Sequence, residues 1–432
     1  MQYPRQVEIV PLTNTPRAIL RVPGSKSITN RALVLAALTA SREHDTRLEG
    51  ALQSEDTEVM IECLTKLGFL VVPNWDAAQI HVRRPTGDRL IPAESADLFV
   101  ANSGTSMRFL TALVALGRGR YRLDGVPRMR ERPIDDLLDA IQRVDIRAVS
   151  ENANGCPPVV VESEGLRGGW IRIHGGISSQ FLSGLLMAAP FAKSDVAIEV
   201  EGMLVSVPYV TMTVAMMRQF GLTFDQDRPG DYCIPAPQRP APLPRYEIEP
   251  DASAASYFFG TAAITGGAIT VVGLPRNSLQ GDVRFVEVLE QMGCRIERGA
   301  DSITVHGGPL HGIDVDMNDI SDTVMTLGAV ACFAHGPTTI RNVAHIRHKE
   351  TDRLTALATE LRRIGAVVDE RTDGLTITPA PLHGAVIETY NDHRMAMSLA
   401  LVGLKIPGIV IDQPGCVAKT YPRFFEDLER LR

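Results

Sequence analysis

The chain has 432 residues, 44% of them hydrophobic, so it is long enough for two or three domains with full cores. Its formal net charge of −7 argues against a nucleic-acid partner or a role at a membrane surface. The six cysteines are scattered without a CxxC pair, no HExxH motif occurs, and there is no signal peptide or long apolar run. We therefore expect a cytoplasmic protein with reduced thiols and no metal site.

The first predicted helix follows a Pro23-Gly24 turn and carries two cations near its start, Lys26 and Arg31. Ser25 is a suitable N-cap, and the residues from Ala32 to Leu38 are apolar helix formers. The helix dipole favours anions at this end, so cations here run against the usual preference. Free N–H groups and cations together are typical of a site for a multiply charged anion.

This helix opens a unit that recurs six times along the chain. Each unit has a helix that is apolar on all sides, a short strand, and an amphipathic helix. A strand hairpin follows in every unit except the last. Helices apolar on every side are buried. Counting the last strand of the preceding unit, the pattern reads βαβαββ. The six apolar helices are predicted to begin at Ser25, Ser103, Ser178, Asp251, Asp319 and Asn391.

The six units are predicted to form two α/β domains of three units each. Five prolines between Ile234 and Arg245 indicate a semi-rigid linker after the third unit. The sixth unit has no hairpin, whereas Val7–Val10 and Ala18–Val22 form a spare strand pair at the N-terminus. The predicted domains are therefore residues 1–23 with 246–432, and residues 24–245. We expect the ligand to bind in the cleft between them.

Polar and charged residues recur at the starts of the apolar helices and in the loops before the amphipathic ones. Any one of them could be a cap or a solvated charge, but their repetition at equivalent positions indicates function. Several cations imply ligands with carboxylate or phosphoryl groups, and Asp322 and Glu350 among them are candidate general base and acid. No P-loop, GxGxxG or GxSxG motif is present. The residues predict small anionic substrates, proton transfer and no cofactor.

The motifs at these positions are specific and span nearly the whole chain. They resemble the 5-enolpyruvylshikimate-3-phosphate (EPSP) synthase family of 3-phosphoshikimate 1-carboxyvinyltransferases. The resemblance implies two inside-out domains of three βαβαββ units with buried parallel helices. It also implies transfer of the enolpyruvyl group of phosphoenolpyruvate to the 5-hydroxyl of shikimate 3-phosphate. The motifs are PGSKSITNRA at 23–32, NSGTSMRFL at 102–110, PRMRERPI at 127–134, SSQFLSGLLMA at 178–188, RHKETDRL at 347–354, YNDHRMAMS at 390–398 and AKTYP at 418–422.

The resemblance assigns roles to matching residues. The implied catalytic residues are Asp322, Glu350, Lys26, Lys419 and His393, with Asp322 accepting the 5-hydroxyl proton and Glu350 helping to protonate phosphoenolpyruvate. The implied shikimate 3-phosphate residues are Lys26, Ser27, Arg31, Ser178, Ser179, Gln180, Ser206, Tyr209, Asp322, His345 and Lys349. The implied phosphoenolpyruvate residues are Lys26, Asn102, Gly104, Arg128, Gln180, Arg353, Arg394 and Lys419.

Two positions depart from the family pattern. His345 stands where many relatives have Asn, so we expect its substrate contact to be sensitive to pH. Phe109 stands where many have Pro, and it could shift the second apolar helix. Gly104 is retained, which implies inhibition by the phosphonate herbicide glyphosate.

Two alternatives stay open at this point. The sister transferase that acts on UDP-N-acetylglucosamine shares fold and reaction type, but it usually has a catalytic Cys on a mobile loop. Here Met107 and 129–132 fill the cation-rich neighbourhood. A non-catalytic, anion-binding repeat scaffold would explain the units but not the two acids. We expect a monomer whose partners are the two small substrates.

Overall fold

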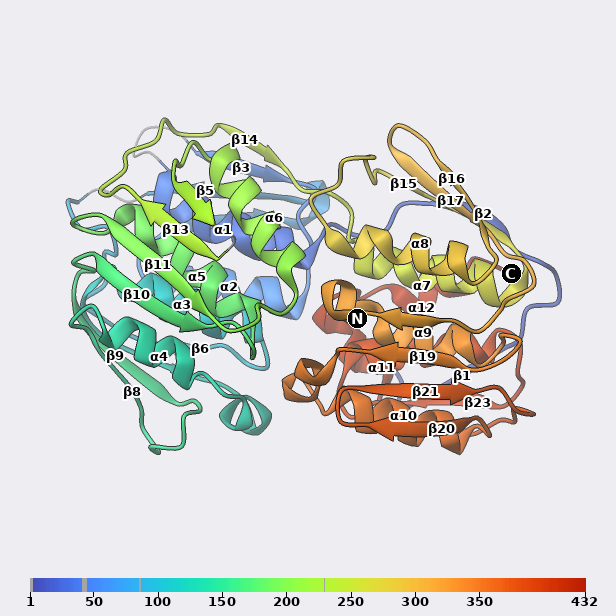
Figure 1. Ribbon diagram of the computed structural model, residues 1–432. Coiled ribbons are helices and arrows are strands. Elements are labelled where there is room, and N and C mark those ends of the chain that lie inside the picture. Colours follow the sequence, from blue (N-terminus) through green and yellow to red (C-terminus); the bar gives the residue numbers. More distant parts are fainter. Residues whose placement is uncertain (1–2, 41–44, 85–86, 229) are drawn as a thin grey trace. The chain divides into compact units, whose positions relative to one another are not determined.

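The computed structural model describes residues 3–40, 45–84, 87–228 and 230–432 (Figure 1). The chain forms two compact units. The terminal unit comprises Met1–Pro23 and Glu249–Arg432, and the middle unit comprises Gly24–Ile248. The sequence placed the second crossing between the units at 245/246. Strand β14 (Arg245–Glu247) pairs with β3 (Thr46–Glu49) of the middle unit, so the crossing comes after it. Residues 1 and 2 of the predicted first domain, and 41–44, 85–86 and 229 of the second, lie outside the described residues.

The middle unit has three four-stranded sheets around inner helices (Figure 1). Its sheets run β14-β3-β5-β4, β6-β7-β9-β8 and β10-β11-β13-β12. The further strands are β4 (Leu70–Asn74), β5 (Gln79–Arg83), β6 (Ser95–Phe99), β7 (Arg118–Asp124), β8 (Arg147–Ser150), β9 (Val159–Glu164), β10 (Gly169–His174), β11 (Val196–Glu201), β12 (Asp225–Arg228) and β13 (Asp231–Ile234). The inner helices are α1 (Lys26–Thr39), α3 (Gly104–Val114) and α5 (Ser179–Ala188). The others are α2 (Glu55–Lys66), α4 (Asp135–Gln142) and α6 (Val207–Gln219), with short 3-10 helices η1 (Trp75–Ala77), η2 (Pro127–Glu131) and η3 (Ala189–Phe191).

The terminal unit repeats this plan with sheets β2-β15-β17-β16, β18-β19-β21-β20 and β22-β23-β1. Its strands are β1 (Gln6–Ile9), β2 (Arg17–Leu20), β15 (Ala268–Val272), β16 (Arg295–Arg298), β17 (Ser302–His306), β18 (Asp314–Asp316), β19 (Thr338–Arg341), β20 (Val367–Arg371), β21 (Gly374–Thr378), β22 (Val386–Ile387) and β23 (Ile409–Asp412). The inner helices are α7 (Ala252–Thr265), α9 (Val324–Ala331) and α11 (His393–Gly403). The others are α8 (Phe285–Gln291), α10 (Arg353–Arg363), α12 (Phe424–Glu429), η4 (Gly281–Arg284), η5 (Asn318–Thr323), η6 (Ala344–His348) and η7 (Pro414–Lys419).

Four inner helices connect parallel neighbouring strands, as the βαβαββ pattern predicts: α3 joins β6 to β7, α5 joins β10 to β11, α9 joins β18 to β19, and α11 joins β22 to β23. The first and fourth βαβαββ repeats exchange their first strands. Strand β2 precedes α1 but pairs with β15, and β14 precedes α7 but pairs with β3. Each crossing of the chain thus supplies one parallel strand to the unit it leaves.

The two N-terminal strands do not pair with each other, so the predicted strand pair is wrong. Strand β1 pairs antiparallel with β23, in the place that a hairpin strand takes in the other sheets. Strand β2 belongs to a different sheet of the same unit. The predicted linker is also part of the middle unit: the Gln238 N–H donates to Pro190 O over 2.7 Å, and its side chain bonds Thr223. A main-chain segment fixed in this way is no spacer.

Four inner helices begin at the predicted N-caps. Ser25, Ser103, Ser178 and Asp251 each accept a bond from a backbone N–H of the first turn. The fifth helix is an exception, because the predicted start at Asp319 lies in η5. Ile320 there is not helical, with φ −127° and ψ 38°, and α9 begins only at Val324.

The sixth helix, α11, begins at His393 and not at Asn391. Asn391 and the residue before it, Tyr390, have positive φ and cannot continue into a helix. Asp392 is the N-cap instead.

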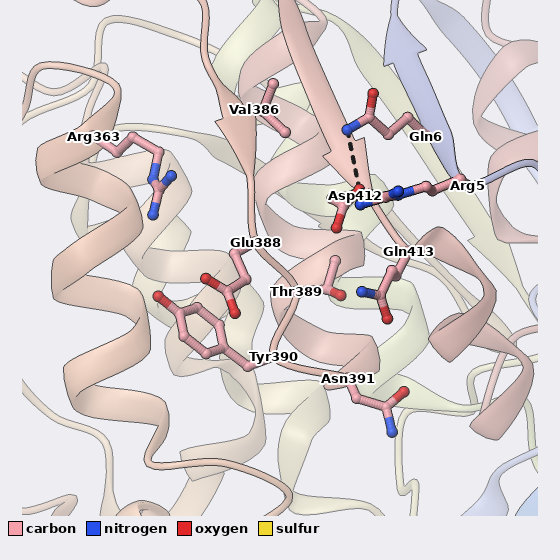
Figure 2. Close-up of a pocket in the computed structure, with 10 residues that line it drawn as sticks. All are labelled: Arg5, Gln6, Arg363, Val386, Glu388, Thr389, Tyr390, Asn391, Asp412 and Gln413. Carbon is pink, nitrogen blue, oxygen red and sulfur yellow. Dashed lines mark hydrogen bonds and ion pairs between the residues drawn. The ribbon is translucent and has the colours of Figure 1, made fainter.

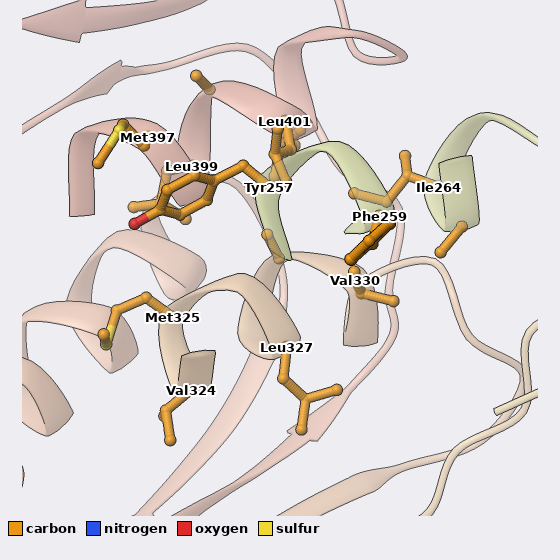
Figure 3. Packing of buried hydrophobic residues seen from close by; sticks show 14 of the residues in the cluster. Tyr257, Phe259, Ile264, Val324, Met325, Leu327, Val330, Met397, Leu399 and Leu401 are labelled. Atoms are coloured by element: carbon orange, nitrogen blue, oxygen red, sulfur yellow. The ribbon is translucent and has the colours of Figure 1, made fainter. Parts of the chain in front are cut away.

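The core of the terminal unit lies where α7, α9 and α11 meet (Figure 3). Gly260 permits this approach, since a Cβ there would lie 2.9 Å from Thr326 Cγ2 and 3.1 Å from Leu401 Cδ1. One hydroxyl from each helix joins a buried series of hydrogen bonds. The Ser256 oxygen lies 3.1 Å from that of Thr326, which lies 3.2 Å from that of Ser398. Most of the remaining interface is apolar, so burial drives the three helices together. Near their starts, Arg394 of α11 contacts Tyr257 of α7 and Asp322 of η5, in the candidate site.

Candidate active site

In the terminal unit, the candidate residues gather around one guanidinium group, that of Arg353 at the start of α10. It contacts three carboxylates: Asp392 over 2.8 Å, Glu350 over 2.9 Å and Asp322 over 3.1 Å. Arg353 is only 1% exposed. Burial would lower the pKa of Arg353, but the three carboxylates outweigh it and raise this pKa. A rigid, planar fork of donors can hold three acids at fixed positions, which a lysine could not do.

Asp322 has a second cation. Arg394, in the first turn of α11, donates to the other carboxylate oxygen over 2.6 Å. The hydroxyl of Tyr257 lies 3.4 Å from the same arginine. The kink in η5 makes this possible, because Asp322 lies before the regular helix and faces two helix starts at once. Two guanidinium groups stabilise the ionised carboxylate, the form a general base needs.

Lys419 and His393 complete this group. Lys419, at the end of η7, is 3% exposed, and its Nζ lies 3.9 Å from Glu350 Oε1. His393 is 1% exposed, with Nδ1 3.6 Å from Asp392 Oδ1. The terminal unit therefore brings together all its predicted catalytic residues. Lys349 ends η6 and is partly buried beside them.

His345 does not behave as expected. Its Nε2 lies 2.9 Å from Ser321 Oγ, and the residue is 5% exposed. Burial, together with the nearby charge of Lys349, lowers the pKa of His345 to about 3, although Asp322 acts in the opposite direction. The imidazole is thus neutral in ordinary buffers, and the predicted pH-sensitive contact is wrong.

In the middle unit, Arg31 ties α1 to α6, and it also reaches Ser183 of α5 over 3.5 Å. Its Nε donates to Thr213 over 2.7 Å, and its two terminal nitrogens bond the carbonyls of Ser27 and Tyr209 over 2.9 and 3.2 Å. None of these partners is charged, and Arg31 is 2% exposed. Burial lowers the pKa of Arg31 to about 10, which leaves it charged at neutral pH. It therefore puts a positive charge behind Ser27 and Tyr209.

Lys26, the first residue of α1, lies beside Asp56 of α2, with Nζ 3.4 Å from Oδ2. Lys26 is 9% exposed and Asp56 1%. Sequence reasoning missed Asp56. It lies inside the first turn of α2, whereas Arg128, Ser206 and Glu350 precede their amphipathic helices, so a search of the loops before those helices passes over it.

Gly104 opens α3 beneath two arginines. A Cβ at this position would lie 2.3 Å from an Arg108 nitrogen and 2.5 Å from an Arg132 nitrogen. Arg132 also donates to the Asn102 carbonyl over 3.3 Å. The missing side chain lets the guanidinium groups cover the helix start, where an anion is favoured. Both arginines lie within motifs of the family resemblance, which assigned neither of them to a ligand.

The remaining candidates of the middle unit lie at the starts of α5 and α6 and in η2. Ser178 caps α5, followed by Ser179, and Gln180 reaches Thr105 of α3 over 3.4 Å. Ser206 caps α6 with φ 53°, and Tyr209 lies in the first turn. Arg128 of η2 pairs with Glu131 over 2.7 Å and is partly exposed.

Phe109 does not interrupt α3, which runs from Gly104 to Val114. Its ring is fully buried, and the Arg31 guanidinium carbon lies 5.1 Å from the ring centre. Phe109 thus supports Arg31 by a cation–π contact.

The comparisons with known proteins agree with this geometry. Residues 13–428 match the family model of EPSP synthase (3-phosphoshikimate 1-carboxyvinyltransferase). The chain belongs to the EPSP synthase family. A 3-phosphoshikimate 1-carboxyvinyltransferase of Trichormus variabilis is 52% identical over 96% of this chain and 97% of the relative. One from Nostoc punctiforme is 51% identical over 98% and 99%.

Solved structures show the same fold. EPSP synthase from Acinetobacter baumannii superposes with a TM-score of 0.81 at 25% identity, over 99% of this chain and 98% of that one. The enolpyruvyl transferase NikO from Streptomyces tendae has a TM-score of 0.77 at 21% identity, over 99% and 96%. The predicted fold of two inside-out domains of βαβαββ units is confirmed.

Family membership also decides between the alternatives. The chain is an enzyme, so the non-catalytic scaffold is wrong, and the UDP-N-acetylglucosamine alternative is not favoured. Within the described residues, no group of three His, Cys, Asp or Glu side chains could hold a metal ion. No helix there is long and apolar enough to span a membrane.

Proposed function

We propose that this EPSP synthase family member transfers the enolpyruvyl group of phosphoenolpyruvate to the 5-hydroxyl of shikimate 3-phosphate, releasing phosphate. The observation that carries the proposal is the Arg353 cluster, where two acids suited to proton transfer share one buried cation. Proton transfer next to fixed positive charge is what this addition and elimination require.

The ring and phosphate of shikimate 3-phosphate are assigned to polar groups at the helix starts. The middle-unit contributors are Lys26, Ser27, Arg31, Ser178, Ser179, Gln180, Ser206 and Tyr209, and the terminal-unit contributors are Asp322, His345 and Lys349. Arg31 is buried and its donors are occupied, so we assign it an indirect part: it holds Ser27 and Tyr209 and supplies long-range charge. His345 takes part as a neutral hydrogen-bonding group.

Phosphoenolpyruvate is assigned to the cations and to the open helix start at Gly104. The proposed set is Lys26, Asn102, Gly104, Arg128, Gln180, Arg353, Arg394 and Lys419. Arg108 and Arg132 join it because both cover Gly104. Arginines bind phosphoryl and carboxylate groups through two parallel hydrogen bonds, which suits a ligand that carries both.

The proposed reaction has two stages. Glu350, with Lys26 and Lys419, protonates C3 of phosphoenolpyruvate, so that C2 becomes electrophilic. Asp322 accepts the 5-hydroxyl proton while the oxygen bonds to C2, giving a tetrahedral intermediate. The C2–O bond to phosphate then breaks, and loss of one proton from the new methyl group restores the double bond. His393 is proposed to assist from beside Asp392.

The proposal includes no cofactor, and the partners are the two small substrates. We further propose that the chain acts as a monomer in the cytoplasm. The cysteines of the described residues are unpaired thiols, which suits a reducing compartment. Inhibition by glyphosate stays a prediction from the retained Gly104.

The test is phosphate release from the purified protein mixed with both substrates. We expect release that requires both, and a loss of at least a hundredfold in Glu350→Ala and in Lys26→Met, because proton transfer contributes about 10² to 10⁴ in rate. Arg371→Ala, which alters an exposed ion pair with Asp369, is the control and should keep full activity. Wild-type protein that releases no phosphate would contradict the proposal.

A further inference from the structure

The turn that leads into α11 has an unfavourable backbone. The Asp392 N–H donates to Thr389 O over 2.8 Å and closes a turn. The two central residues, Tyr390 and Asn391, have φ of 53° and 52°. Turns of this kind usually contain glycine, because a side chain is disfavoured in the left-handed region. Such a conformation persists only where other contacts hold it in place.

The contacts that hold it come from a buried acid on α10. Glu360 is 0% exposed, and its Oε1 accepts a hydrogen bond from the Tyr390 hydroxyl over 2.8 Å. Its other oxygen accepts the Glu388 N–H over 3.1 Å and lies 3.0 Å from Arg363 Nε. Burial, followed by the bond to Glu360, raises the pKa of Tyr390 to about 12, so the hydroxyl keeps its proton.

Beside these contacts to α10 the turn is open to solvent. A solvent-open hollow of about 450 Å³ lies there, lined by Thr389, Tyr390, Asn391 and Gln413 among others (Figure 2). Figure 2 shows the Tyr390 ring directed toward the helix that carries Arg363. The polar contacts to α10 therefore hold this segment at the edge of the hollow.

The residue after the turn reaches the candidate active site directly. Asp392 caps α11 by accepting the Arg394 N–H over 2.8 Å, and it accepts Arg353 Nε over 2.8 Å. Arg353 and Glu360 belong to the same helix, α10. One helix thus holds the turn at both ends, by Glu360 before it and by Arg353 after it.

We propose that Glu360 and Tyr390 are positioning residues of the active site, which set Asp392 and, through it, the two arginines Arg353 and Arg394. Neither touches a reacting atom. The inference rests on the proposed function, in which these arginines bind phosphoenolpyruvate. It predicts a selective effect on that substrate, which a merely structural role would not produce.

The test measures steady-state kinetics of Tyr390→Phe, which removes one hydroxyl and keeps the ring. We expect KM for phosphoenolpyruvate to rise about tenfold, as loss of a hydrogen bond to a charged group implies. KM for shikimate 3-phosphate should rise less, because the two arginines reach that substrate only through Asp322. Glu360→Gln should act in the same direction and serves if the first variant folds poorly. Tyr121→Phe is the matched control: its hydroxyl donates to Ala93 O over 2.7 Å in the middle unit, so both KM values should stay as in wild type.

Hydrogen exchange of the 388–394 backbone gives a readout that does not depend on turnover. We expect faster exchange there in Tyr390→Phe and no change in Tyr121→Phe. A wild-type KM for phosphoenolpyruvate in Tyr390→Phe would overturn the inference, whether or not exchange changes. If the wild-type protein itself showed no turnover, the proposed function would be wrong, and unchanged exchange would separately refute the anchoring of the turn.

Discussion

At the scale of single residues, burial decides what each charged group can do. Arg353 stays charged at 1% exposure because three carboxylates surround it. Arg31 is equally buried but has only uncharged partners, so burial lowers its pKa to about 10. In the terminal unit, Arg353 holds three acids in place. In the middle unit, Arg31 contributes positive charge and has uncharged hydrogen-bond partners.

His345 allows a prediction about pH at this scale. Its pKa is lowered to about 3 in the folded protein, against about 6.5 in an unfolded chain. Between these values the unfolded state binds one more proton, so this residue's stabilising contribution, full above pH 6.5, falls by about 1.4 kcal/mol per unit as pH drops. We expect His345→Asn to unfold with a shallower pH dependence between pH 6.5 and 4, as measured by urea denaturation.

The control for this experiment is His383→Asn, because the His383 side chain is exposed. It should leave the slope of the unfolding free energy against pH unchanged. The same steep slope in His345→Asn as in wild type would show that His345 is not the group responsible.

At the scale of elements, the candidate site residues lie at helix starts whose local structure departs from that of an ordinary capped helix. The start of α3 is open because Gly104 has no side chain beneath Arg108 and Arg132. The start of α9 is delayed by the kink in η5, which leaves Asp322 facing Arg353 and Arg394.

Gly104→Ala tests the first of these arrangements. The new Cβ would meet the flexible ends of two arginine side chains, so the fold should tolerate it while the guanidinium groups move. We expect an unchanged melting temperature and a KM for phosphoenolpyruvate at least tenfold higher, measured by phosphate release. Gly176→Ala is the control, since a Cβ there has no neighbour within 4 Å. Equal KM values in the two variants would argue against a ligand at the α3 start.

At the scale of the whole molecule, the N-terminal segment belongs to the terminal unit although the middle unit follows it in sequence. Strand β1 completes the sheet with β23, and Ile9 contributes to the core at 6% exposure. Strand β2 completes another sheet, and its Ile19 is 77% exposed.

Ile9→Ala should therefore destabilise the terminal unit by about 2 to 4 kcal/mol, the usual range for a truncated core side chain. Ile19→Ala is matched in residue type and chain region, and it should change the unfolding free energy by less than about 0.5 kcal/mol. Denaturant unfolding followed by hydrogen exchange of 249–432 would measure both. Equal effects of the two substitutions would contradict the assignment of β1 to this core.

The sequence by itself determined the repeating unit, four of the six inner helix starts, and most of the site. These features are local: an N-cap, an apolar run and a cation at a helix start are readable within about ten residues. It did not determine that β1 and β2 join separate sheets, that α9 begins late, that His345 is neutral, or that Asp56 and Glu360 matter. Most of these features depend on partners distant in the sequence, such as β1 with β23, Lys26 with Asp56 or Glu360 with Tyr390. Burial and pairing between distant segments exist only once the chain has folded, so only the tertiary structure could decide them.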